Sequence, residues 1–371
     1  MRQTNKIRKG IAWLLCTVLV LGILPILPQI SMQISAAENA ASVFVDGVEL
    51  HAGSQEYFKN GDTADSGATG TYEDHSAYYD TAGELWLNNL EAHTIKANGN
   101  LTIYVCNNQE TNTNIVTATQ NETAIEVTGY LTIRYGGYGG GTGSLTVESD
   151  GKEAIQAGSG MTVSDGVEVK VRAKSGATAI SSGGVLKIDG IRTKLEAAGD
   201  GSTGKGIFAQ QSIYVKNSAV LTAFGGAAAY ESPSGIDKSG YGYEDYNVFT
   251  GDAAPGTQAA KDTVLDGYKY IRIEPTGVAN VKTLTELQAA AQNQYISLIN
   301  VMNDITITDT VYVRRAVTIQ SPDASNVSKL IRGKSHTDVI LDFDGANGHK
   351  SDVVTLKNII VDGNKDGNTQ T

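Results

Sequence analysis

Six aromatic residues are the side chains of this 371-residue sequence best suited to binding chemistry. Sugar rings stack on exposed aromatic faces, and a long, flat surface suits an extended polysaccharide. Trp86 lies in the alternating segment Leu85-Trp-Leu87, whose parity predicts that the indole points outward. For the tyrosines between 241 and 246, covering a hydrophobic core is the alternative interpretation. The predicted glycan contacts are Trp86, Tyr135, Tyr138, Tyr241, Tyr243 and Tyr246.

A second group of polar residues follows the last apolar segment and has the spacing of a metal-binding loop. Asp362, Asn364 and Asp366 alternate and precede Gly367, which matches the first half of a calcium loop. The acid expected at the twelfth position of such a loop would fall beyond residue 371. A turn rich in Asp, Asn and Gly after a strand explains the same residues, so both readings stay open. No other cofactor is predicted.

Catalytic constellations are not found. Elimination on an acidic polysaccharide would need clustered carboxylates for Ca²⁺ and a nearby Arg or Lys, and a glycosidase would need paired acids. Among the residues expected to face outward, Glu168 and Glu196 come closest to such a pair, and each has a lysine two positions away. Solvated ion pairs explain these residues. The histidines lack metal-ligand spacing, so a non-enzymatic protein is predicted; they are His51, His75, His93, His336 and His349.

The elements that must position these side chains are repeated. One series of isoleucines has spacings of 30, 30, 25, 27 and 29 residues: Ile95, Ile125, Ile155, Ile180, Ile207 and Ile236. A second series has spacings of 30, 30, 25 and 27: Leu101, Leu131, Met161, Leu186 and Ile213. A third strand, exemplified by Leu145-Thr-Val147, recurs between them. Three alternating strands per unit predict an all-β fold, a right-handed parallel β-helix whose coils stack.

Both ends of this repeat, in a module predicted to span 38–275, have candidate caps. Residues 41–84 contain Val43-Phe-Val45 and precede the first coil, and residues 240–273 follow the last one. Pro275-Thr-Gly277 then predicts a linker to a second module, residues 276–371. In that module a capping box at Thr283 and Glu286 predicts a helix to about Tyr295, followed by further β-helix rungs that we expect to be incomplete.

The N-terminal residues 1–37 have the three parts of a secretory signal peptide. Four basic residues precede an apolar stretch from Ile11 to about Ile30, and small residues follow at 35–37. A retained membrane anchor is the alternative. Cleavage would remove four positive charges and no acid, moving the net charge from −11 to about −15. Such acidity disfavours nucleic acid and anionic membranes as partners. A single cysteine, Cys106, would remain, so no internal disulfide is possible.

The repeated segments resemble those of a known group. Gly-x-Leu-Thr-Ile, Ala-Ile-x-Val and Leu-Thr-Val are similar to segments of clostridial-type extracellular proteins of the pectin-lyase-like β-helix superfamily, which include surface proteins described as carbohydrate-binding. The second module, with Asn303-Asp-Ile-Thr-Ile307 and Leu356-Lys-Asn-Ile-Ile-Val-Asp-Gly363, resembles the opening of β-helix regions in bacterial adhesins. The resemblance implies fold more strongly than activity, because this architecture hosts lyases, hydrolases, adhesins and stalks.

Together these observations predict a secreted, cell-surface β-helix protein that binds a polysaccharide or cell-wall glycan without catalysis. Two alternatives stay open. One is a polysaccharide lyase or hydrolase whose active site lies outside this segment, and the other is a structural stalk. The sequence predicts no membrane span after cleavage and leaves the oligomeric state undetermined.

Overall fold

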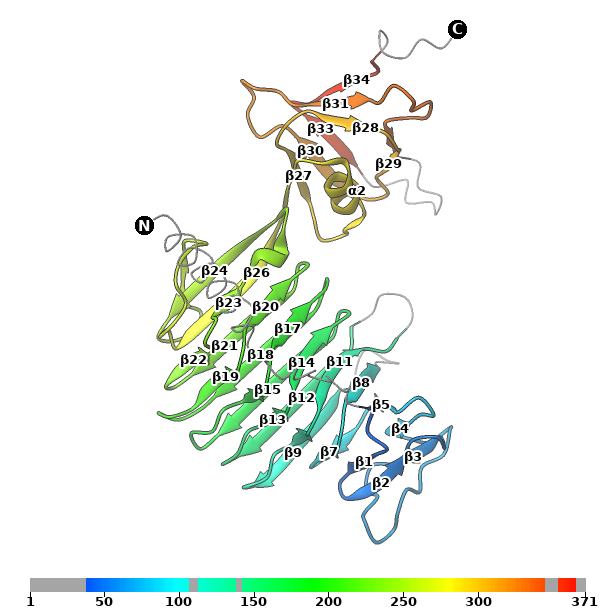
Figure 1. The fold of residues 1–371 in the computed structure, drawn as a ribbon, viewed down its shortest axis with the longest axis vertical. Coiled ribbons are helices and arrows are strands. Elements are labelled where there is room, and N and C mark those ends of the chain that lie inside the picture. The colour runs from blue at the N-terminus through cyan, green and yellow to red at the C-terminus, as the bar shows by residue number, and fades with distance from the viewer. Residues whose placement is uncertain (1–37, 107–112, 138–141, 344–352, 365–371) are drawn as a thin grey trace, which may run out of the picture. The chain divides into compact units, whose positions relative to one another are not determined.

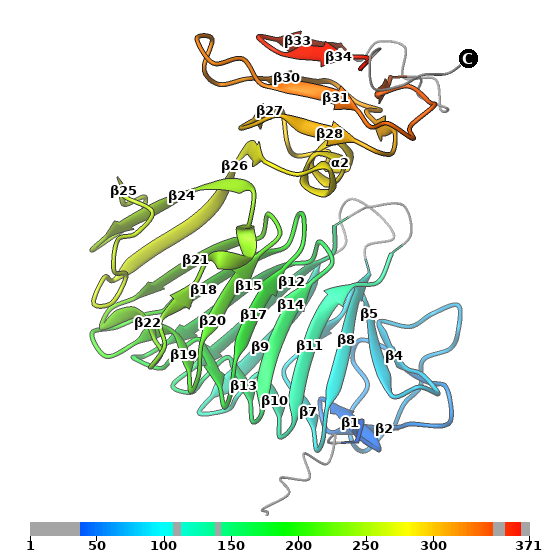
Figure 2. The ribbon, with the colours of Figure 1, turned by 45° about the horizontal axis from the view of Figure 1, so that its top comes forward.

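The computed structural model describes residues 38–106, 113–137, 142–343 and 353–364, and the chain from Asn39 onward forms one compact unit. This unit is a β-solenoid of about nine turns, which confirms the predicted fold class (Figures 1 and 2). Along the first part of the unit, each coil contributes one strand to each of three sheets. The alternation of apolar and polar residues in every strand therefore places one set of side chains inside the coil and the other on its surface.

The three sheets run side by side along the stacked coils. The eight-stranded sheet has the order β2 (Val48–His51), β1 (Ser42–Val45), β7 (Ile95–Ala97), β10 (Ile125–Val127), β13 (Ile155–Ala157), β16 (Ile180–Ser182), β19 (Lys205–Ala209) and β22 (Ala228–Glu231). The nine-stranded sheet has the order β23 (Ile236–Asp237), β20 (Ile213–Lys216), β17 (Leu186–Asp189), β14 (Gly160–Ser164), β11 (Tyr130–Tyr135), β8 (Leu101–Cys106), β5 (Glu84–Asn88), β4 (Ala77–Tyr79) and β3 (Glu56–Phe58).

The third sheet has twelve strands and continues into the C-terminal part. Its order is β33 (Val354–Lys357), β30 (Val317–Gln320), β27 (Leu298–Val301), β26 (Tyr270–Val281), β21 (Val220–Gly225), β18 (Lys194–Gly199), β15 (Glu168–Lys174), β12 (Ser144–Asp150), β9 (Asn114–Gln120) and β6 (Glu91–Ala92), with β24 (Glu244–Gly251) and β25 (Thr257–Ala259) paired off this path.

The predicted ladders lie inside the coils. Ile125 is in register with Ile95 on one side and with Ile155 on the other, and the ladder continues through Ile180 to Ile207. All five side chains are fully buried. The series from Leu101 to Ile213 is likewise in register and buried in the neighbouring sheet. Removing several methyl groups from such a position costs about 2–5 kcal/mol, because the coils above and below cannot close the cavity.

The prediction that Ile236 is the last member of the isoleucine ladder is wrong. Ile207 is in register with Tyr230, whereas Ile236 pairs with Ile213 in the neighbouring sheet. The coil shortens because only two residues separate β21 from β22, where the preceding turn between β18 and β19 has five. Gly226 makes the tight turn feasible, since a Cβ there would lie 1.9 Å from the carbonyl oxygen of Gly201.

Antiparallel strands lie at both ends of this first part, within the residues predicted to form the two caps. At the N-terminal end, β1 runs antiparallel to β7 and β4 runs antiparallel to β5. At the other end, β26 runs antiparallel to β21 and also pairs with β24. A reversed strand satisfies the ladder of the outermost coil without continuing the coil, so these strands protect the sheet edges.

The predicted linker at 275–277 is a strand. β26 passes through it without interruption, antiparallel to β21 over Tyr270–Ile273 and parallel to β27 over Val278–Val281. Pro275 is tolerated because it lies opposite an irregularity in β24, between Glu244 and Tyr246, where the ladder is already broken. The buried apolar residues nevertheless form two clusters, one ending at Ile273 and the other beginning at Ala279. A domain boundary near 275 stays a prediction.

The C-terminal part begins with the predicted helix. α2 (Leu284–Gln292) has the full capping box between Thr283 and Glu286. It ends before the predicted Tyr295, because the Asn293 side chain accepts a hydrogen bond from the Tyr295 amide and forms a turn. Arg315 donates to the carbonyl oxygens of Ala290 (2.9 Å) and Ala291 (3.2 Å), which satisfies the end of the helix.

Further coils follow α2 and form two additional small sheets. One has the order β28 (Ile305–Ile307), β31 (Lys329–Arg332) and β34 (Ile360–Asp362), and the other pairs β29 (Val311–Tyr312) with β32 (Leu341–Asp342). The last apolar segment, residues 353–361, contributes to two strands, β33 and β34. They are separated at Asn358, whose φ of 46° turns the chain.

A buried carboxylate lies where the two parts meet. The Glu244 side chain accepts hydrogen bonds from the Ser218 hydroxyl (2.6 Å) and from the Asn293 amide (3.0 Å). Ser218 precedes β21 and Asn293 caps α2, so this acid joins segments on both sides of β26. Burial raises the pKa of Glu244, and the hydrogen bonds from Ser218 and Asn293 only partly oppose this effect.

Candidate functional site

A surface hollow with mixed polar and aromatic lining lies on the outer face of the twelve-stranded sheet. It has a volume of about 490 Å³ and crosses β12, β15, β18, β21 and β26. Because these strands are in register, the outward residues form rows that run from coil to coil. One row contains Thr146, Lys170, Glu196, Thr222 and Arg272. The other contains Glu148, Arg172, Ala198, Phe224 and Tyr270.

The shape of this groove follows from the sizes of neighbouring residues in the second row. Ala198 lies between the long side chain of Arg172 and the ring of Phe224, which leaves a depression at its position. Ala254, in the turn after β24, forms part of the wall. Tyr270 is almost completely buried because that turn packs on its ring, and a Cβ added to Gly256 would lie 2.8 Å from the ring.

Ion pairs fix most of the charged side chains of the groove. Arg172 donates to one carboxylate oxygen of Asp200 through Nε (2.7 Å) and Nη2 (2.6 Å). The other pairs are Lys174 with Glu148 (2.8 Å), Lys170 with Glu168 (3.2 Å) and Arg272 with Glu274 (2.5 Å). Polar groups held in this way keep defined directions, which is what an orienting contact to a ligand requires.

The two predicted acids do not form a catalytic pair. Glu168 is in register with Lys194 and Glu196 is in register with Lys170, so the acids do not face each other on adjacent coils. Glu168 is 3.2 Å from Lys170 and 3.6 Å from Lys194, which supports the ion-pair interpretation of that residue. Glu196 is exposed and lines the groove.

Trp86 belongs to a row of aromatic rings on the outer face of the nine-stranded sheet. Its indole is half-buried and stacks on Tyr104, with 4.1 Å between ring centroids and 8° between the planes. On its other side lies Tyr78, at 5.8 Å and 3°, and Tyr57 follows at 5.8 Å from Tyr78. The guanidinium of Arg134 lies over the free side of Tyr104, 5.3 Å from the ring centroid.

This row changes the interpretation of Trp86. The outward direction predicted for the indole agrees with the structure, but neighbouring rings cover both of its faces, and its Nε1 donates to Asp80 (3.0 Å). A ring therefore lies on each side of the indole, and a glycan contact by Trp86 stays a prediction. The sequence did not reveal Tyr78 as a partner of Trp86, because Tyr78 lies outside the repeat. Burial raises the pKa of Tyr78 to about 12.

The other predicted aromatic residues lie in different places. Tyr241 is buried, and its hydroxyl donates to the carbonyl oxygen of Ala219, so an exposed face is excluded. Tyr246 is half-buried at 4.8 Å from Tyr241, and Tyr243 packs against the C-terminal apolar cluster. The structure therefore favours the alternative in which these tyrosines cover the core. Tyr135 packs against the N-terminal cluster, and Tyr138 lies outside the described residues.

Comparison with known proteins gives a match in the C-terminal part. Residues 278–371 match the family model described as putative pectate lyase-like adhesive domain. The match begins within β26, at the second apolar cluster, and agrees with the β-solenoid fold and the predicted pectin-lyase-like resemblance. No curated protein and no solved structure matches the chain. The groove lies on strands N-terminal to the matched residues, except for β26, in which the match begins.

Two of the three predicted calcium residues, Asp362 and Asn364, form a turn. Asp362 accepts a hydrogen bond from the Asn364 amide nitrogen (2.8 Å), and the Asn364 side chain donates to the Arg332 carbonyl oxygen (2.9 Å). Asn364 has a φ of 49°, as is common for Asn in turns. Asp366 lies outside the described residues, among which no group of three His, Cys, Asp or Glu side chains could hold a metal. A calcium site stays a prediction.

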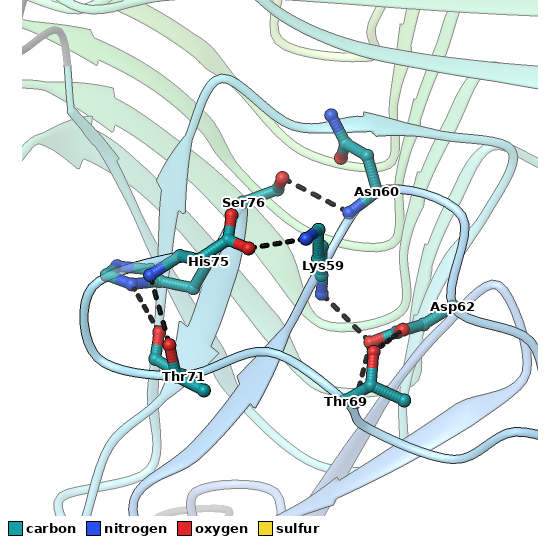
Figure 3. A network of polar contacts seen from close by, with 8 residues as sticks. Lys59, Asn60, Asp62, Thr69, Thr71, His75 and Ser76 are labelled. Atoms are coloured by element: carbon teal, nitrogen blue, oxygen red, sulfur yellow. Dashed lines mark hydrogen bonds and ion pairs between the residues drawn. The ribbon is translucent and has the colours of Figure 1, made fainter.

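A polar network fixes the long loop between β3 and β4 (Figure 3). The buried carboxylate of Asp62 accepts hydrogen bonds from the amide nitrogens of Lys59 and Thr69, each at 2.9 Å. Burial works to raise the pKa of Asp62, but the hydrogen bonds from Thr69 and Lys59 outweigh it and lower the pKa. Lys59 also pairs with Asp74, so this loop is held by its own side chains.

The predicted signal peptide, residues 1–37, lies outside the described residues. In the part of the chain that is described, no helix has the length and apolar character needed to cross a membrane.

Proposed function

We propose that this protein is an exported, non-catalytic adhesin that holds a polysaccharide in the groove of the twelve-stranded sheet. The adhesive-domain match and the β-solenoid support an adhesive or carbohydrate-binding role. The observation that carries the proposal further is the groove, which crosses five neighbouring strands and combines fixed polar groups with one half-buried aromatic ring, Phe224. Export rests on the predicted signal peptide.

The chemistry of the groove suits sugar binding. Hydroxyl groups of a sugar both donate and accept hydrogen bonds, and the groove offers guanidinium, carboxylate and threonine side chains at consecutive coils. Arg172 is held by two contacts to Asp200, so little side-chain entropy is lost when it binds a ligand. Phe224 supplies an apolar surface for the hydrophobic face of a pyranose ring.

We propose that the groove is not catalytic because the basic side chains that line it are held in ion pairs. A lyase-type elimination needs a side chain that is free to remove a proton from the substrate. Lys170, Arg172 and Arg272 each form an ion pair with a carboxylate instead.

Polysaccharide retention by the purified protein tests the proposal. Ala198→Trp should fill the depression and reduce retention on plant, host and bacterial polymers at least tenfold. Ser181→Trp, which adds the same bulk on the outer face of the eight-stranded sheet, should not. Equal effects of the two changes, or no retention of the wild type, would contradict the proposed site. Release of unsaturated or reducing-end products would contradict the non-catalytic role.

A further inference from the structure

The charges of the groove are unevenly compensated. Six charged residues line it, and five of them form the ion pairs described above: Glu148, Lys170, Arg172, Asp200 and Arg272. Glu196 is the exception, since no ion pair or hydrogen bond joins its side chain to another described residue. It occupies the centre of the first row, between Lys170 and Thr222.

We infer that the groove selects a glycan carrying protonated amino groups, with Glu196 as the residue that determines this specificity; the inference rests on the proposed function. An ammonium group placed beside Glu196 would gain an ion pair without breaking an existing one. Such a pair is worth more in a groove than on an open surface, because fewer water molecules separate the charges.

Polyanionic glycans should bind less well to the groove. A uronate polymer would bring one carboxylate per sugar toward Glu196, which repels it. Every cation that lines the groove already lies against an acid, so binding would require breaking pairs such as the two-contact pair between Arg172 and Asp200. The excess of acidic residues over the whole chain, 40 against 29 basic ones, adds long-range repulsion.

The experiment compares ligands that differ only in charge. Binding of the glucosamine hexamer, its N-acetylated form and an oligogalacturonate would be measured by calorimetry at about pH 6, where amino groups are protonated. We expect the glucosamine hexamer to bind about tenfold more tightly than the acetylated hexamer and oligogalacturonate to bind most weakly. Raising the ionic strength should reduce the first difference, because salt screens exposed charges.

Matched variants assign the preference to one residue. Glu196→Gln should remove the tenfold difference between the two hexamers. Glu126→Gln makes the same change of net charge on the outer face of the eight-stranded sheet and should retain the preference. A preference that survives in Glu196→Gln, or equal binding of the hexamers by the wild type, would overturn the inference but leave the proposed function intact. No binding of any of the three ligands would overturn the inference, and absence of retention in the broader polysaccharide test would overturn the proposed function as well.

Discussion

The aromatic row and the groove lie on different sheets of the same solenoid and use their outward side chains in opposite ways. In the aromatic row, each ring lies beside a ring or a guanidinium from the next strand, so the rings pack against one another. In the groove, the small side chain of Ala198 lies between Arg172 and Phe224 and leaves space for a ligand. A side chain that points outward is therefore not necessarily available to bind a ligand. The faces of the side chain must also be free.

The largest expected effect tests the row. Trp86→Ala should lower the free energy of unfolding by about 2–3 kcal/mol, because it removes a half-buried ring and two stacking partners. Urea unfolding would measure this loss, and Trp86→Phe should recover more than half of it. Glycan retention by folded Trp86→Ala should equal that of the wild type. A selective loss of retention would show that the row binds sugar.

The next effect tests the groove. Phe224→Ala should weaken glycan binding about tenfold, which corresponds to about 1.4 kcal/mol, while lowering the free energy of unfolding by less than that. Phe208 provides the matched control, since it is also half-buried and points outward, but from β19 of the eight-stranded sheet. If Phe208→Ala weakened binding as much as Phe224→Ala, the groove would not be the site.

Alkaline pH should destabilise the aromatic row, by a smaller free energy than either substitution above. Because the pKa of Tyr78 is raised from about 10 to about 12, its contribution to stability is complete below pH 10 and is lost as the pH rises toward 12. We expect a loss of about 1 kcal/mol after allowing for solvent screening of this half-exposed ring. Tyrosinate absorbance would follow the titration. Tyr78→Phe separates this residue from Tyr79, which faces the core and whose pKa burial also raises to about 12; an unchanged alkaline transition in that variant would contradict the assignment.

The smallest effect extends the comparison from exposed acids of the groove to the buried acid at the junction. Since the pKa of Glu244 is raised, its contribution to stability is present at pH below its unfolded pKa and is lost as the pH rises through its folded pKa. Glu244→Gln should therefore raise the free energy of unfolding at pH 7 by up to about 1 kcal/mol relative to the wild type, as measured by urea unfolding. This difference should shrink toward pH 4. Glu196→Gln should leave unfolding unchanged at both values.

The parts of the fold that repeat could be predicted, and the parts where the repeat changes could not. Isoleucines from Ile95 to Ile207 keep their place because each coil must present an apolar side chain to the next. Ile236 leaves the series because a two-residue turn shortens the coil, and no local pattern marks that shortening. Pro275 indicated a break, yet its missing N–H is tolerated opposite the irregularity in β24.

The sites depended on register more than on residue type. Each residue of the aromatic row is visible in the sequence, but Tyr57 and Tyr78 join it only through antiparallel strands before the repeat. For the groove, the spacing of 24, 26 and 26 residues from Glu148 through Arg172 and Ala198 to Phe224 was a usable signal. The contribution of Ala254 could not be foreseen, because it comes from a turn that folds back over β26.

β26 has a mechanical consequence for an adhesive protein. One uninterrupted strand is bonded to β21 and β24 on one side of residue 275 and to β27 on the other. Tension between a ligand held on the coils before β26 and an attachment made after it would pass through this backbone. The neighbouring hydrogen bonds would be sheared together instead of broken one at a time, so the segment predicted to be a linker would transmit load along a paired strand.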